Sequence, residues 1–174
     1  MHRKPLSLTA LFAFAALGIA ADELKNLVVN GNMEEVADGK PAKWATVNSE
    51  GGKVELGSST ENPKEGKRCL QMKGSAEWAV AYSVKIPIDR KKTYMLTGYA
   101  RAKSGTAYIK IDYFQGDKYL EGYTPSEEVT ADNWTKLTVT SELDRHPEAT
   151  HILVAAVAGG DFEAYFDDFV VTAK

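Results

Sequence analysis

Short runs rich in β-branched and aromatic residues, separated by turn residues, recur along most of the chain. Runs of this kind are typical of β-strands, and many short strands joined by turns indicate a sandwich or a barrel. Pro87, Pro125 and Pro147 fall between the runs, as strands require. The sequence therefore predicts an all-β fold, an antiparallel β-sandwich of about eight or nine strands. The candidate strands are residues 27–30, 53–56, 68–73, 77–86, 93–101, 106–114, 134–143, 150–158 and 164–172.

One connection between these runs has the residues of a tight turn. Lys103, Ser104 and Gly105 lie between two of the strongest runs, and glycine reaches the positive φ values that hairpin turns need. We therefore expect residues 93–101 and 106–114 to form a β-hairpin.

The first 21 residues have the pattern of a secretory signal peptide. Arg3 and Lys4 precede an almost unbroken apolar stretch that runs from Leu8 to Ala21 and ends in small residues. The stretch is shorter than the roughly 20 apolar residues that span a bilayer. A buried core helix, the alternative, would lack a polar face. We therefore expect a secreted or periplasmic protein with one domain over residues 22–174, without a lipid anchor, since no cysteine lies near the cleavage point.

The charge and the cysteine content limit the class of the mature domain. Removal of Arg3 and Lys4 leaves 19 basic and 24 acidic residues, and 19 − 24 gives a formal charge of −5. This acidic balance argues against a nucleic-acid partner, because phosphate binding draws on many Lys and Arg contacts. Cys69 is the single cysteine, so no internal disulfide can form. Its position within a strand-like run favours a small buried hydrophobe over a reactive thiol.

The two ends and the middle of the mature chain carry motifs of one family. These motifs are NLVVNGNME at 26–34, Pro41, Trp44, KTYMLTGYAR at 92–101, NWTKLTV at 133–139 and YFDDFVV at 165–171. In these residues the chain resembles carbohydrate-binding modules of the family 4, 9 and 22 type, which are jelly rolls of the galactose-binding-like group. Asn32 and Met33 stand where that family usually has Asp and Phe.

The last strand presents a carboxylate on its core-facing side. If Phe169 and Val171 face the core, the period of two places Asp167 on the same side. A carboxylate there needs a cation or several donors to offset its desolvation. The resemblance implies a structural calcium ion held by Glu34 and Asp167, with Asp168 as a further contributor. Solvated or Lys/Arg-paired carboxylates at a strand end are the alternative.

Alternation along the middle strands predicts a groove suited to sugars. Residues 106–114 place Tyr108, Lys110 and Asp112 on the face opposite Ile109 and Ile111. The preceding strand shows Tyr99 and Arg101 outward, and strands adjacent in sequence are often neighbours in a sheet. We therefore expect one shallow groove with Tyr99 and Tyr108 as platforms, because sugar rings pack on aromatic faces while their hydroxyls need polar partners. An ordinary solvated sheet face is the alternative.

Further aromatic residues are candidates for the same groove. Tyr119 and Tyr123 lie in a polar stretch, either as platforms on a loop or as part of a short strand packed on the sheet. Residues 77–86 are expected to bury Trp78, Val80 and Tyr82 and to leave Ala79, Ala81 and Ser83 as a low floor. Trp78, near the strand end, could still reach the ligand.

No catalytic motif accompanies these features. His146 and His151 are the only histidines of the mature chain, and neither belongs to a nucleophile elbow, a zinc-binding helix or a triad pattern. We therefore expect a non-catalytic binding module for a poly- or oligosaccharide. The alternatives are an extracellular protein- or cell-surface-interaction domain and, less favoured, a small glycan-active enzyme.

Overall fold

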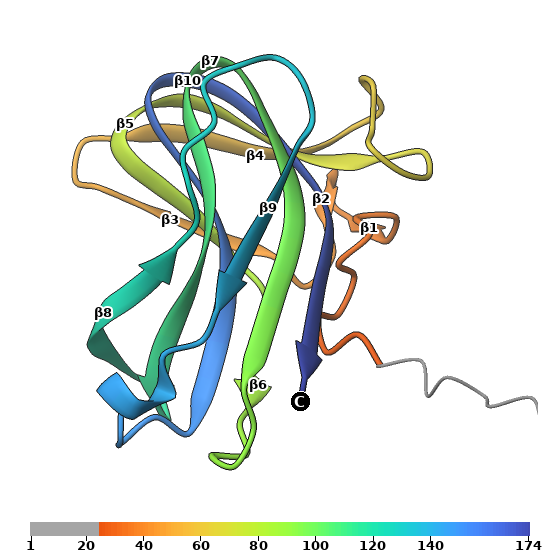
Figure 1. Cartoon of the computed structure of the whole chain (residues 1–174). Coiled ribbons are helices and arrows are strands. Elements are labelled where there is room, and N and C mark those ends of the chain that lie inside the picture. Colours follow the sequence, from red (N-terminus) through yellow and green to blue (C-terminus); the bar gives the residue numbers. More distant parts are fainter. Residues whose placement is uncertain (1–24) are drawn as a thin grey trace, which may run out of the picture.

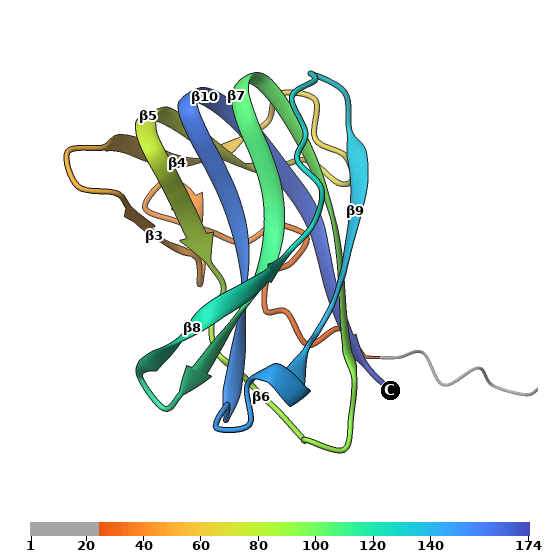
Figure 2. The same cartoon turned by 60° about the vertical axis from the view of Figure 1, so that its left-hand side comes forward.

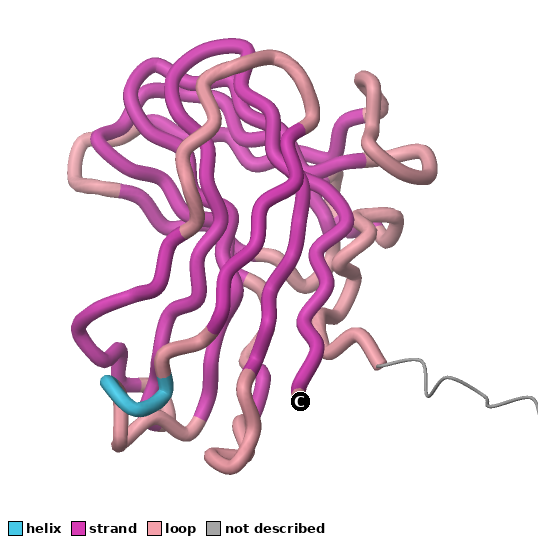
Figure 3. Tube along the Cα trace, in the orientation of Figure 1, coloured by secondary structure: helices cyan, strands magenta, loops and turns pink. Residues whose placement is uncertain are grey.

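The computed structural model describes residues 25–174, which consist mainly of antiparallel β-strands joined by loops (Figures 1 and 3). The expected signal peptide, residues 1–21, lies outside the described residues. Within residues 25–174, no helix has the length and apolar character needed to cross a membrane. The elements are β1 (Val36–Ala37), β2 (Lys40–Pro41), β3 (Ala45–Asn48), β4 (Lys53–Ser59), β5 (Cys69–Tyr82), β6 (Ile86–Pro87), β7 (Tyr94–Gln115), β8 (Lys118–Pro125), β9 (Thr135–Thr140), the 3₁₀ turn η1 (Leu143–Arg145) and β10 (His151–Ala173).

Three long strands, β5, β7 and β10, bend over one end of the molecule and contribute to both layers of the sandwich (Figures 1 and 2). We call one layer the groove layer; it consists of β3, residues 79–82, residues 151–158, residues 106–115 and β8, in that order. The other, the clamp layer, consists of β4, residues 69–76, residues 160–173, residues 94–104 and β9. All of these pairings are antiparallel, so the expected all-β, antiparallel sandwich is confirmed.

The expected hairpin at residues 103–105 is wrong. Residues 94–115 form the single strand β7, and both of its halves pair with β10 and not with each other. Gly105 has a φ of +70°, and a Cβ built there would lie 2.5 Å from the carbonyl oxygen of Gly159. The glycine thus lets β7 bend across β10 at close approach, where the pairing register also shifts between Gly159 and Glu163.

The core fills the space between the two layers. Leu96 and Ala100 from the clamp layer and Ile109 and Ile111 from the groove layer are fully buried, as the alternation along β7 predicts. Trp44 and Phe169 pack with ring centroids 5.0 Å apart. The two layers therefore share one apolar core, and each keeps an outer face for other contacts.

The segment expected as the first strand, residues 27–30, is not a strand. It lies beside β10, where the Leu27 N–H donates to the carbonyl of Val171 at 3.0 Å. Asn30 and Met33 then adopt left-handed conformations, with φ values of 52° and 57°. A second backbone hydrogen bond, from the Phe169 N–H to the carbonyl of Gly31 at 2.8 Å, holds the segment beside β10, but the left-handed turns keep it from continuing as a strand.

Candidate functional site

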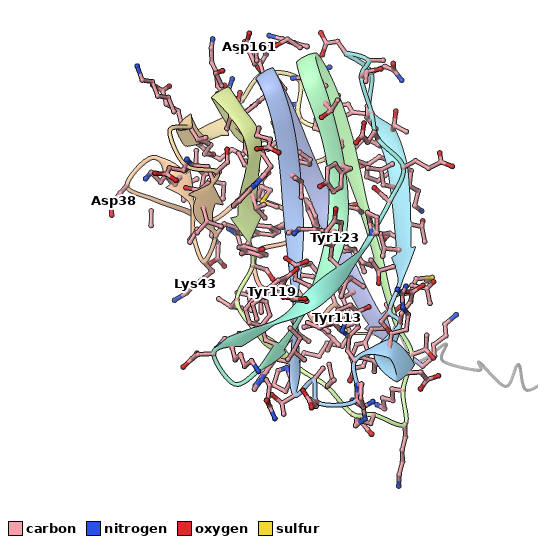
Figure 4. All side chains as sticks on the ribbon, turned by 90° about the vertical axis from the view of Figure 1, so that its left-hand side faces the viewer. Asp38, Lys43, Tyr113, Tyr119, Tyr123 and Asp161 are labelled. Carbon is pink, nitrogen blue, oxygen red and sulfur yellow. The ribbon has the colours of Figure 1, made fainter. Side chains whose placement is uncertain are left out.

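A groove of about 470 Å³ lies on the outer face of the groove layer. Figure 4 looks onto the side of the molecule that carries β8 and labels Tyr119 and Tyr123 on that strand. Six of the ten lining residues are aromatic, which makes the groove mainly apolar. The lining residues are Val47, Trp78, Val80, Tyr82, Tyr108, Lys110, Phe114, Tyr119, Tyr123 and Val157.

The ladder register explains why these side chains meet. Val157 of β10 pairs with Val80 of β5 on one side and with Tyr108 of β7 on the other. Two residues along β10, Ala155 lies between Tyr82 and Lys110. Side chains two apart on a strand share a face, so the small and branched residues of β10 form a low floor between aromatic walls.

Strand β8 supplies one wall. Tyr123 pairs with Asp112 and Tyr119 pairs with Phe114, which puts both tyrosines on the groove face of the layer. Tyr119 packs edge-on against Phe114, with ring centroids 5.5 Å apart. Both residues therefore belong to a strand that packs on the sheet and also line the groove, which combines the two alternatives that the sequence left open.

The sequence-based assignment of faces in residues 77–86 is wrong. Ala79 and Ala81 are fully buried in the core, whereas Trp78, with 42% of its surface exposed, and Tyr82 line the groove. The inward set of β5 changes parity between Ala76 and Ala79, next to the register shift at Ala158 and Gly160. A one-residue slip moves every later side chain to the other face. Strict alternation along β5 does not predict this change of the core-facing side between Ala76 and Ala79.

Lys110 and Tyr82, which line the groove, both contact the buried carboxylate of Asp112. Lys110 Nζ lies 2.8 Å from Asp112 Oδ2, and the Tyr82 hydroxyl donates to the same oxygen. Asp112 is fully buried, and its Oδ1 has no hydrogen-bond partner among the described residues. Burial, together with the hydrogen bond to Asp112, raises the pKa of Tyr82 above its ordinary value, so the phenol stays protonated at neutral pH.

Burial also raises the pKa of Tyr108 and of Tyr119 in the groove, so both keep their hydroxyl protons at neutral pH. Burial, with the neighbouring Tyr123 as the next cause, raises the pKa of Tyr108 to about 12. The Lys110 ammonium lies 4.6 Å from the centroid of the Tyr123 ring, within cation–π range. The Lys110 ammonium therefore interacts with both the Asp112 carboxylate and the Tyr123 ring.

The prediction that Tyr99 and Arg101 share a groove with Tyr108 is wrong. Both residues lie on the half of β7 that belongs to the clamp layer, where Tyr99 pairs with Asp167 and Arg101 with Tyr165. The bend at Gly105 carries the chain from one layer to the other, so outward residues before and after it face opposite sides of the sandwich. The pattern predicted the outward positions correctly, but not that one strand serves two layers.

Arg101 is a structural residue of a clamp on that opposite face. It is 2% exposed, its guanidinium lies 3.7 Å from the centroid of the Tyr165 ring, and it donates to Asp132 Oδ1 at 2.6 Å. It also donates to the carbonyl of Glu61 at 2.8 Å. These contacts fix the loop of residues 60–68 against the clamp layer, and they leave Arg101 unavailable to a ligand in the groove.

The expected metal ligands Glu34 and Asp167 contact the same loop. Asp167 Oδ2 accepts hydrogen bonds from the backbone N–H groups of Lys64 and Glu65, at 2.9 and 3.1 Å. Glu34 Oε1 accepts from the N–H groups of Lys67 and Arg68, at 2.8 and 2.9 Å. The carboxylates from the two ends of the domain therefore hold one loop in common.

The chemistry of this pair is compatible with a bound cation. Asp167 is fully buried and forms no ion pair with a side chain of residues 25–174, and burial raises its pKa to about 6. The prediction that Asp167 lies on the core side with Phe169 and Val171 is wrong. Asp168 adopts a left-handed φ of 51° at a shift in the pairing register, so Asp167 lies with Tyr99 on the outer face of the clamp layer. Side chains of this region form no group of three or more His, Cys, Asp or Glu within residues 25–174. A calcium ion would therefore take the two carboxylates together with backbone carbonyl oxygens, a ligand set that calcium accepts.

Comparison with known proteins gives the family. The family model CBM_4_9, described as a carbohydrate binding domain, matches residues 25–157. The chain belongs to this family. Comparison with the curated proteins gave no match.

Solved structures with the same fold include binding domains and enzymes. The CBM22-1 xylan-binding domain of Paenibacillus barcinonensis Xyn10C aligns with a TM-score of 0.61 at 18% sequence identity. The alignment covers 86% of the present chain and 94% of the xylan-binding domain. The CBM22-1–GH10 part of Clostridium thermocellum xylanase 10B, complexed with xylohexaose, aligns at 0.58 and 15% identity, covering 87% and 28%. A Stig cyclase from Fischerella sp. TAU, complexed with an indole compound, aligns at 0.61 and 15% identity, covering 86% and 96%. At these identities the likeness establishes the fold.

Proposed function

We propose that this chain is a non-catalytic, exported module that binds a poly- or oligosaccharide in the groove. The observation that carries the proposal is the row of aromatic side chains along a sheet face, where Tyr82 and Lys110 contact the buried Asp112. Sugar rings pack their C–H faces on such rings, and their hydroxyls need a few directional partners. Family membership supports the same ligand class.

Affinity electrophoresis on soluble polysaccharides tests this proposal. Trp78→Ala and Tyr108→Ala remove two walls of the groove, and each should abolish or strongly reduce the retardation by a bound polysaccharide, because each removes a stacking platform. Tyr99→Ala is the matched control, since Tyr99 lies on the clamp layer. Retardation that survives both groove variants but not Tyr99→Ala would move the site to the other face. No retardation by any polysaccharide in a broad panel would favour a protein-interaction domain.

A second candidate is a small aromatic ligand in the same groove. The observation that favours it is the lining itself, in which Lys110 is the one charged side chain among ten residues. The Fischerella cyclase, which shares the fold, was solved with an indole compound. Quenching of tryptophan fluorescence by a panel of indoles, with competition by xylohexaose, distinguishes the two ligand classes. Tight indole binding without any sugar competition would replace the first proposal by the second.

We further propose a structural calcium ion at Glu34 and Asp167. What supports it is the buried Asp167 carboxylate, which has backbone donors but no cationic side chain within residues 25–174. Bound calcium would supply positive charge that holds the loop of residues 60–68 to both ends of the domain. This role is separate from ligand binding, because Asp167 pairs with Tyr99 on the clamp layer.

A further inference from the structure

Tyr82 and Asp112 meet across an intervening strand at the centre of the groove. Tyr82 belongs to β5 and Asp112 to β7, and β10 lies between these two strands. Ala155 of β10 pairs with Tyr82 on one side and with Lys110 on the other. Its methyl side chain leaves the space above the strand open, so the Tyr82 hydroxyl reaches Asp112 Oδ2.

Asp112 has unused hydrogen-bonding capacity. Its Oδ2 accepts from Tyr82 and from Lys110, whereas Oδ1 is buried without a partner among the described residues. A buried acceptor without a donor is unfavourable and native proteins contain few of them, which makes Asp112 a candidate for a functional role.

The bond to Asp112 leaves Tyr82 with one hydrogen-bonding role. A tyrosine hydroxyl has one proton to donate and lone pairs that accept. The proton of Tyr82 is directed to Asp112, so the hydroxyl oxygen can only accept from a ligand. Lys110 can only donate, and the hydroxyls of the other groove tyrosines can rotate to do either. Tyr82 is therefore a fixed acceptor beside a fixed donor.

We propose that Tyr82 and Asp112 together determine ligand specificity. They select ligands that present a free hydroxyl donor to the Tyr82 oxygen in the groove. Asp112 is the positioning residue and Tyr82 the contact residue. A glycan whose hydroxyl is O-methylated at that point leaves the Tyr82 oxygen without a donor and binds less tightly. This inference rests on the proposed glycan-binding function. It adds that the groove recognises a sugar hydroxyl as a hydrogen-bond donor to Tyr82.

The test measures retardation by soluble xylan, laminarin and galactomannan, each also as its O-methylated derivative, which accepts hydrogen bonds but cannot donate them. The quantity compared is the ratio of the affinities for the two forms. Tyr82→Phe removes the acceptor and keeps the ring, and Asp112→Asn removes the carboxylate at almost constant shape. Tyr99→Phe is the matched control, because Tyr99 lies on the clamp layer, on the face opposite the groove.

We expect the wild-type preference for the free hydroxyl form to fall about tenfold in Tyr82→Phe, the effect of about one hydrogen bond. Asp112→Asn should lower the preference to a similar extent, and the double variant should lose little more, because the two residues act as one unit. Tyr99→Phe should stay within about twofold of the wild type. A change in stability alone would lower both affinities and leave their ratio unmoved.

Two other results have distinct meanings. If the wild type binds a polysaccharide and Tyr82→Phe keeps the wild-type preference, the inference is overturned while the proposed function stands. If the wild type binds none of the three polysaccharides in either form, the proposed function fails, and the inference fails with it. Tyr82→Phe decides the outcome even if Asp112→Asn does not fold.

Discussion

The buried carboxylate of Asp167 predicts a specific dependence of stability on pH in metal-free protein. Burial raises the pKa of Asp167 from an ordinary value of 3.8 to about 6, because desolvation outweighs the three backbone hydrogen bonds that it accepts. Between these two pKa values, Asp167 of the folded protein therefore keeps a proton that the unfolded chain has released.

The magnitude follows from the size of the shift. A difference of about two pKa units corresponds to about 3 kcal/mol at 1.36 kcal/mol per unit. For a group whose folded-state pKa is raised, the favourable contribution is complete below the unfolded pKa and is lost as pH rises through the folded pKa. Asp167 should therefore contribute its full stabilisation below about pH 4 and lose about 3 kcal/mol by about pH 7.

Urea unfolding in the presence of a chelator, at several pH values between 4 and 7, measures this loss. Asp167→Asn is the comparison, since asparagine has nearly the same shape and does not titrate. Glu163, whose pKa a hydrogen bond from Tyr165 lowers to about 2, titrates in both proteins and cancels in the difference. The free energy of unfolding of the wild type should fall by about 2–3 kcal/mol more than that of the variant across this range. Parallel curves, within about 0.5 kcal/mol, would refute the argument from burial.

Three further predictions concern the metal, the clamp and the bend. Chelation should lower the melting temperature of the wild type and leave that of Glu34→Gln unchanged, because a ligand that binds only the folded state stabilises it; equal responses in a calorimeter would contradict the calcium proposal. Arg101→Met should cost about 2 kcal/mol in urea unfolding, since it removes the buried stack on Tyr165 and two hydrogen bonds, while sugar binding persists. Gly105→Ala should destabilise the protein more than Gly116→Ala, which has a similar positive φ but nothing within 4 Å of the added Cβ; equal melting temperatures would show that the close approach at Gly105 is unimportant.

Several features of the site could be predicted from the sequence. Alternation along residues 106–114 gave the groove positions of Tyr108, Lys110 and Asp112, and the motifs of the chain ends gave the family. The polar stretch around Tyr119 and Tyr123 indicates both as candidates without deciding between a loop and a strand. The sequence does not predict Tyr82 and Val80 on the groove face, because the side of β5 that faces the core changes after Ala76. The local irregularity at Gly159 and Gly160 was the one signal that could have indicated this change.

The sequence by itself determined the β-structure, the inward and outward sets of residues 94–101 and 106–114, and the family. These properties depend on residues that are close in sequence, through side-chain period and turn chemistry. The tertiary structure decided which outward sets share a face. Strand β7 crosses from one layer to the other at Gly105, so Tyr99 and Arg101 serve the clamp on one side while Tyr108 and Asp112 serve the groove on the other. That division depends on the pairing of β7 with β10, a contact between residues far apart in the chain, and no local pattern specifies it.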